Sequence, residues 1–310
     1  MSRIGVFFRG LLMGAADLIP GVSGGTIALI SGIYYRLIKA IRCCDLTAVK
    51  CLLSGSFSQF WNRIDGGFLV ILVSGILVSI FSLARLVEVL LIDYPLPLWS
   101  CFFGLILASA IFLIHRIDRL GIFRLFLVFM GLILSGAITL MPGVTLVGGW
   151  EIVFISGFVA IVAMILPGIS GSFILVLLGM YPSLINAIST VDISFLFLFL
   201  AGAIVGLIVF SRILTNLLAK ANEATMSVMS GFLLGSLPAV WPWKKVAQTS
   251  RDESGALVSS QSLPVSPWDY SLYQGVSPQL ELCIFMMALG FTVICILEAF
   301  GSKNRADNKE

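Results

Sequence analysis

Six stretches of the chain stay apolar for about 18 residues or more, which is enough for a helix to cross a bilayer. Only 11% of the residues are charged, whereas soluble domains carry about 25%. The sequence therefore predicts an all-α polytopic membrane protein with about six transmembrane helices. These spans are expected at 66–92, 96–115, 121–141, 193–219, 224–241 and 279–300.

Two further apolar regions, 4–41 and 150–190, are interrupted by nearly the same letters. The first contains "PGVSGGT" at 20–26 and the second contains "PGISGSF" at 167–173. Proline and glycine break helices, and a bilayer offers no water to the backbone groups that a break sets free. We therefore expect each region to form a re-entrant hairpin of two half-helices. The expected pieces are 4–18 with 22–41, and 150–166 with 169–190.

The repetition continues past the two motifs. A shift of 147 places residue 20 on residue 167, and eleven of the 22 positions that follow are identical. The shift then becomes 127, because the first copy carries an extra loop of about twenty residues. This pattern predicts a tandem duplication, with repeats 1–141 and 142–310. Since an odd number of spans separates the hairpins, the second copy is expected to be inverted.

Lysine and arginine predict the orientation, because loops rich in these residues stay in the cytoplasm. With the N-terminus inside, only Lys244, Lys245 and Arg251 fall outside, all in the polar outer loop 241–278. Both termini are then cytoplasmic. The six cysteines lack disulfide or zinc-finger spacing and are predicted to be free thiols.

Inverted repeats with broken helices are typical of transporters, where the N-termini of half-helices present free N–H groups to an anion. Glycines let the backbone approach a ligand closely, and serine or threonine hydroxyls add donors. The alternative is that the glycines only permit tight helix packing. The predicted substrate-binding residues are Pro20, Gly21, Ser23, Gly24, Gly25, Thr26, Pro167, Gly168, Ser170, Gly171 and Ser172.

Four charged residues extend this candidate site. Arg85 and Arg212 correspond under the 127-residue shift, and a guanidinium inside a membrane suggests phosphate or carboxylate binding. The alternatives are pairing of Arg85 with Glu88, and extension of Arg212 to the cytoplasmic surface. Asp17 and Glu88 are candidates for coupling transport to an ion gradient, although Asp17 could instead cap the second half-helix.

Catalysis is not expected from this sequence. A catalytic serine–histidine or cysteine–histidine pair could use only the single histidine, His115, which lies in a basic turn away from both motifs. No metal-binding or nucleotide-binding pattern is found, and no cofactor is predicted. The residues therefore indicate a transporter of an anion that carries a phosphate or carboxylate group.

The stretch "GAADLIPGVSGGTIALISGIY" and its second copy "LPGISGSFILVLLGMY" resemble the bacterial DUF368 family, the polyprenyl-phosphate transporters called PopT. The resemblance covers essentially the whole chain. It implies a multi-pass protein of the bacterial cytoplasmic membrane that moves undecaprenyl phosphate from the outer to the cytoplasmic leaflet for reuse in cell-wall synthesis. The lipid would be the partner, and the paired motifs would hold its headgroup. The alternatives are a transporter of a small soluble anion, which would use the same motifs without a groove for a lipid tail, and a membrane enzyme or scaffold that acts on a lipid phosphate.

Overall fold

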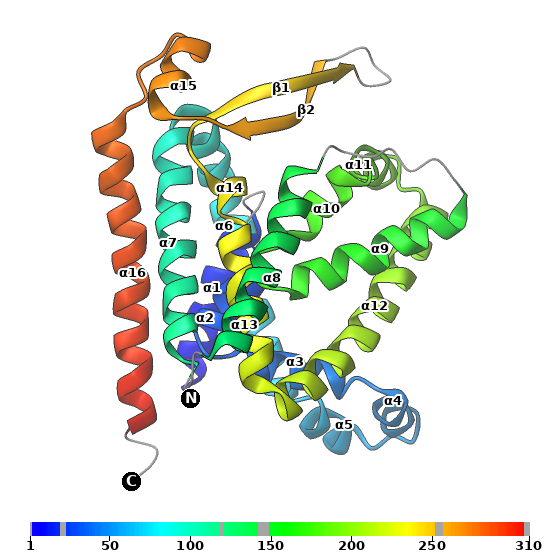
Figure 1. Ribbon diagram of the computed structural model, residues 1–310. Helices are drawn as coiled ribbons and strands as arrows, with labels where there is room; N and C mark the ends of the chain where they lie inside the picture. Colours follow the sequence, from blue (N-terminus) through cyan, green and yellow to red (C-terminus); the bar gives the residue numbers. More distant parts are fainter. Residues whose placement is uncertain (1, 19–22, 118–120, 142–148, 252–256, 307–310) are drawn as a thin grey trace.

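The computed structural model of the chain describes residues 2–18, 23–117, 121–141, 149–251 and 257–306. Within these ranges, it describes the backbone but not the side chains of residues 46, 49, 84, 88, 246–251, 257–262 and 297–306. Helices dominate (Figure 1). Those before residue 142 are α1 Arg3–Asp17, α2 Gly24–Ile30, α3 Tyr34–Arg42, α4 Leu46–Leu53, α5 Phe57–Arg63, α6 Gly66–Asp93, α7 Pro95–His115 and α8 Ile122–Leu140. Those after it are α9 Trp150–Ile165, α10 Gly171–Leu177, α11 Tyr181–Ser189, α12 Ile193–Lys220, α13 Asn222–Gly235, α14 Leu237–Val240, α15 Pro267–Gln274 and α16 Leu280–Ala306, with strands β1 Lys244–Arg251 and β2 Leu257–Pro264.

Four pairs of long helices carry most of the packing: α1 with α6, α9 with α12, α7 with α16, and α8 with α13. A reciprocal glycine contact lies in each pair. Gly10 faces Gly75 between α1 and α6, so that a methyl group on either glycine would overlap a backbone carbonyl of the other helix. The remaining pairs meet in the same way through Gly157 with Gly202, Gly104 with Gly290, and Gly131 with Gly231. Small residues of this kind let helix backbones approach closely inside a membrane.

The helix pairs correspond under the sequence repeat. The 147-residue shift places Gly10 on Gly157, and the 127-residue shift places Gly75 on Gly202, so the α1–α6 seam matches the α9–α12 seam. Helix α7 likewise matches α13 through Gly104 and Gly231, and each packs on a helix of the other half. The two copies therefore fold with equivalent helix pairs, while the inversion of the second copy stays a prediction.

Each interrupted region contains three helices instead of the two expected pieces. The predicted pieces 22–41 and 169–190 are broken again, at Gly32 and Gly179, whose φ angles are 75° and 68°. Beyond Gly32, the Ile33 N–H donates to the Ala28 carbonyl, and Met180 beyond Gly179 does the same to Leu175, both at 3.0 Å or less. This pattern is the Schellman helix end, which requires a left-handed residue that glycine adopts without strain. The chain consequently bends by 108° between α10 and α11.

The largest apolar core surrounds the short helices α2 and α3. Ile33 is fully buried there, together with Leu214 of α12 and Leu233 of α13. The outer faces of the long helices are apolar as well, for example at Phe81, Ile122 and Phe197, which are 84%, 86% and 73% exposed. A chain that is apolar both inside and outside is suited to lipid as its surrounding solvent.

Among the described residues, four helices are long and apolar enough to cross a membrane: α7, α8, α12 and the Gly66–Leu83 part of α6. The bent pair α10–α11 makes a fifth if it is counted as one span, and the apolar parts of α9 and α16 are shorter. The predicted span 224–241 is divided into α13 and α14. Helix α13 ends at Gly235, and Pro238, which has no N–H group to continue the ladder, lies in the first turn of α14. The chain is thus a multi-pass helical membrane protein.

The predicted outer loop 241–278 contains structure that an all-α prediction omits. Strands β1 and β2 form an antiparallel hairpin, followed by α15 at the end of the molecule opposite to the start of α1 (Figure 1). Trp241 and Trp243 hold this segment together by donating from their indole nitrogens to the carbonyls of Val265 and Pro278, both at 2.9 Å. Trp243 also packs with Leu96 of α7 and Cys283 of α16, which attaches the segment to the long helices. The Lys244 ammonium lies 4.4 Å from the ring centre of Trp99, and burial lowers its pKa to about 8.

Candidate functional site

The first break is held by side chains at the start of α2. Ser23 has an extended backbone, and its hydroxyl accepts from the Gly25 N–H at 3.1 Å. The Asp17 carboxylate, at the end of α1, accepts from the Gly24 N–H at 2.6 Å. These contacts satisfy N–H groups that the start of a helix leaves free. Asp17 therefore makes the capping contact considered from the sequence, and its coupling role stays a prediction.

The second break is stabilised by residues of the first copy. Helix α9 ends at Ile165, which leaves the carbonyls of its last turn without helical partners. The Ser23 hydroxyl donates to the Met164 carbonyl at 2.9 Å, and the buried Tyr34 hydroxyl donates to the Ile165 carbonyl at 2.9 Å. The two motifs, far apart in the sequence, thus lie against each other.

A third bond joins the motifs directly. Beyond the end of α9, Gly168 has a φ of 87°, and its N–H donates to the hydroxyl of Thr26 at 3.0 Å. Thr26 is 1% exposed and Ser23 2% exposed, so these bonds form away from solvent. Buried backbone groups freed by one break are therefore bonded by side chains from the other half of the chain, which couples the two halves mechanically.

The motif glycines are closely surrounded by protein. A methyl group on Gly24 would lie 2.5 Å from the Asp17 carboxylate, and one on Gly25 would lie 2.9 Å from the carbonyls of Met164 and Ile165. At Gly171 it would lie 2.6 Å from the Ala160 carbonyl. These glycines are thus required for packing. Substituting them would not by itself distinguish packing from ligand binding.

The second motif keeps hydroxyls that are not used to join the halves. Ser170 is buried at the start of α10, Ser172 is exposed one residue into it, and their hydroxyl oxygens lie 2.9 Å apart. Across the described part of the chain, no acceptor is recorded for the first-turn amides of α10, whereas those of α2 are bonded to Asp17 and Ser23. The two motifs are therefore chemically unequal, and the free donors belong to the second.

The predicted arginines lie apart from these contacts. Arg85 on α6 and Arg212 on α12 both have exposed side chains, and their part in substrate binding stays a prediction. None of the hydrogen bonds or ion pairs of the described residues joins either arginine to the motifs. Pro20, Gly21 and the side chain of Glu88 lie outside the described residues. Pro167 is buried in the second break.

Sequence reasoning missed Tyr34 as part of the site. Its hydroxyl fixes the end of α9 and its ring is 3% exposed, whereas its counterpart Tyr181 is 39% exposed. A signal was present, since tyrosine stands at this position in both copies. All six cysteines are free thiols, as predicted. Within the residues that the structure describes, no cluster of histidine, cysteine and carboxylate side chains could hold a metal ion.

The fold defines a multi-pass helical membrane protein with two joined helix breaks. A sequence profile of the undecaprenyl phosphate translocase-like family matches residues 13–258, and the chain belongs to that family. It is 38% identical to the polyprenyl-phosphate transporter of Vibrio cholerae serotype O1 over 303 residues, which is 98% of each chain. It is 36% identical to the polyprenyl-phosphate transporter of Staphylococcus aureus over 253 residues, 76% of this chain and 84% of the relative. No solved structure matches the chain significantly.

Proposed function

We propose that this protein transports polyprenyl phosphate across the membrane and holds the lipid's phosphate at the joined motifs. The observation that carries the proposal is the bond between Gly168 and Thr26, which brings the two family motifs together inside a helical membrane protein. Two relatives that match most of the chain are named polyprenyl-phosphate transporters. A shared broken-helix site is the usual place for an anionic substrate in transporters of this architecture.

The second motif supplies the proposed headgroup contacts. A phosphate oxygen accepts several hydrogen bonds, and Ser170 and Ser172 present two hydroxyls beside each other at the break. The first motif serves mainly as a support, since its hydroxyls are already bonded to the end of α9 and to Gly168. The apolar outer faces of the long helices suit the polyprenyl tail, which remains in lipid while the headgroup crosses.

The proposed direction is from the outer to the cytoplasmic leaflet, so that the carrier is reused in cell-wall synthesis. It rests on the family resemblance and on the lysine and arginine distribution, which favours two cytoplasmic termini in the bacterial inner membrane. The equivalent helix pairs support an inverted repeat with a re-entrant hairpin in each half. Two equivalent halves could open the same site to either side by related motions.

Ion coupling is proposed to involve Asp17, and its capping bond gives a way to test this. Asp17→Asn keeps a side-chain oxygen for the Gly24 N–H but removes the carboxylate charge, whereas Asp17→Ala removes both. If Asp17 couples transport, Asp17→Asn should bind lipid normally and lose the dependence of transport on the ion gradient. Unchanged gradient dependence in Asp17→Asn would show that Asp17 is only a cap.

Binding of the lipid is tested by native mass spectrometry of the purified protein. Undecaprenyl phosphate, undecaprenyl pyrophosphate and inorganic phosphate are compared for the wild type, for Ser170→Ala/Ser172→Ala, and for Arg85→Ala/Arg212→Ala. The matched control is Ser189→Ala/Thr190→Ala, which removes two exposed hydroxyls that donate to the Asn186 carbonyl, far from the motifs in the sequence.

We expect the wild type and the control to retain the monophosphate lipid and the Ser170/Ser172 variant to lose most of it. Equal binding by all variants would remove the two hydroxyls from the site. Loss confined to the arginine variant would place the headgroup there instead. Capture of inorganic phosphate without the lipid would favour a transporter of a small soluble anion.

A further inference from the structure

A polar cavity lies away from the motifs, at the end of the molecule where α1 begins. It has a volume of about 520 Å3 and lies between α3, the end of α5 and the start of α6. Its charged lining consists of Arg36, Lys39, Arg63 and Asp65, and its polar lining includes Asn62 and Cys43. This volume is in the range of ordinary small-ligand sites, which is about 300–1,000 Å3.

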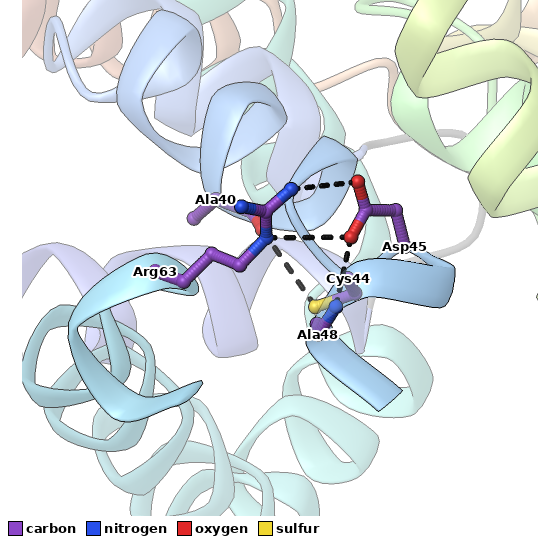
Figure 2. A network of polar contacts seen from close by, with 5 residues as sticks. All are labelled: Ala40, Cys44, Asp45, Ala48 and Arg63. Atoms are coloured by element: carbon purple, nitrogen blue, oxygen red, sulfur yellow. Dashed lines mark hydrogen bonds and ion pairs between the residues drawn. The ribbon is translucent and has the colours of Figure 1, made fainter. Parts of the chain in front are cut away.

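The segment that forms one wall is the part of the first copy without a counterpart in the second. Helices α4 and α5 lie between α3 and α6, whereas α11 and α12 are joined by residues 190–192 alone. Asp45, at the start of this added segment, is bonded to Arg63 at its end (Figure 2). Asp45 caps α4 by accepting from the Ala48 N–H at 2.9 Å, and it also accepts from two nitrogens of Arg63, at 2.8 and 3.3 Å.

Carboxylates hold both arginines in place without using all of their donors. Asp65 accepts from Nε and Nη2 of Arg36 at 2.6 and 3.0 Å, and the same guanidinium lies 4.3 Å from the ring centre of Phe68. Each guanidinium has five N–H donors, so three remain on each arginine after these bonds. The hydrogen bond to Arg63 also holds the pKa of the Asp45 carboxyl below its usual value.

The cavity has an excess of positive charge. Arg36, Lys39 and Arg63 oppose Asp65 and Asp45, and among the described residues no ion pair is recorded for Lys39. Two oriented guanidiniums with spare donors and one unpaired ammonium suit a dianion that has several acceptor oxygens. A phosphate monoester has that charge and those acceptors near neutral pH.

We propose that this cavity binds a phosphate monoester, either as the headgroup of a lipid or as a small free phosphate. Lys39 and the unused donors of Arg36 and Arg63 contact the phosphate oxygens. The site does not include the motif serines, and its existence does not depend on transport. If the chain moves a lipid phosphate as proposed above, the cavity gives the headgroup a second binding position at the end of the molecule that the second repeat cannot reproduce.

The thiol of Cys43 reports occupancy directly, because it is half-buried and lines the cavity. The test measures the rate at which an uncharged maleimide labels a full-length protein in which Cys43 is the only cysteine. A protein with Cys51 as its only cysteine is the control, since Cys51 is also half-buried but lies on α4 outside the cavity lining. Inorganic phosphate, undecaprenyl phosphate, phosphatidylglycerol and sodium chloride of equal ionic strength are compared as protectants.

At a phosphate concentration ten times Kd, about one site in eleven is free, so labelling of Cys43 should slow about tenfold and labelling of Cys51 should not change. Protection by inorganic phosphate identifies a site for the free ion, and protection by the monophosphate lipid alone identifies a headgroup site. No protection by either, or equal protection by phosphatidylglycerol, which is a phosphodiester, would overturn the proposal.

Two variants separate this inference from the proposed function. Lys39→Gln should abolish most of the protection, whereas Arg42→Gln, which removes a neighbouring exposed charge outside the lining, should keep it. Equal behaviour of these two variants would mean that general surface charge causes the effect. Ser170→Ala/Ser172→Ala should leave the protection of Cys43 unchanged. If the wild-type protein shows protected Cys43 but does not transport the lipid, the proposed phosphate site in the cavity is retained and the proposed transport function is rejected.

Discussion

The bond between Thr26 and Gly168 gives the sharpest prediction about how the two halves are held together. Thr26→Val keeps nearly the same shape and removes only the oxygen that accepts from the Gly168 N–H at 3.0 Å. The site is closed to water, since Thr26 is 1% exposed and Gly168 is buried. A buried N–H without an acceptor costs about 1–3 kcal/mol, so this variant should lose that much free energy of unfolding.

The matched control is Thr215→Val. Thr215 is 4% exposed, and its hydroxyl donates to the Ser211 carbonyl within the same helix, at 2.6 Å. Among the described residues its hydroxyl bonds to a carbonyl of its own helix and to no backbone N–H, so removing it leaves no such N–H without a partner. The expected loss is therefore the net value of one hydrogen bond, about 0.5–1.5 kcal/mol.

Thermal unfolding in detergent, followed by tryptophan fluorescence, measures both variants against the wild type. A loss of 1 kcal/mol lowers the Tm by about 2–4 °C in chains of 150–250 residues. Thr26→Val should therefore lower the Tm by several degrees and by more than Thr215→Val does. Equal shifts for the two variants would refute the inference that a buried amide of one half depends on a hydroxyl of the other.

Three further predictions concern the seams and the two polar ends. Gly75→Ala should cost about 1–3 kcal/mol by overpacking the α1–α6 seam, while Gly67→Ala, which meets open space, should not destabilise; chemical denaturation of both variants checks this. The Arg63 bond lowers the pKa of Asp45. The ionised Asp45 carboxylate should therefore stabilise the folded state fully above about pH 4, and this stabilisation should be lost as the pH falls through the lowered pKa. Hydrogen exchange of 43–65 should show that loss in the wild type and not in Asp45→Asn. Burial lowers the pKa of Lys244 to about 8, so its charged form opposes folding and the Tm should rise between about pH 8 and 10. Lys244→Met should lack that rise, and an equal rise in both proteins would contradict the assignment.

The positions of the helix breaks could be predicted because proline and glycine act locally. The motifs at 20–26 and 167–173 lie where α2 and α10 begin, at Gly24 and Gly171. The second break in each region was missed, although Gly32 and Gly179 are identical in the two copies. Glycine is compatible with a continuous helix at modest cost, so its letter alone does not specify a left-handed helix end.

The contacts that join the two motifs could not be predicted, because they depend on distances between segments far apart in the sequence. Repeat symmetry suggested equal roles for the two motifs, but hydroxyls of the first bond the end of α9 while those of the second bond each other. The same symmetry paired Arg85 with Arg212, and both side chains are exposed. Hydropathy also gave no indication of the β1–β2 hairpin, since polar residues form strands and loops alike.

The central claim is that the joined motifs carry a lipid phosphate across the membrane, and transport in reconstituted vesicles tests it most directly. A fluorescent polyprenyl phosphate is placed in both leaflets, and an impermeant quencher measures how fast the inner pool reaches the outside. The account predicts rapid movement of the monophosphate with the wild type and with Ser189→Ala/Thr190→Ala. It predicts slow movement with Ser170→Ala/Ser172→Ala and with empty vesicles. Movement no faster with the wild type than in empty vesicles, or equally fast with the Ser170/Ser172 variant, would contradict the account.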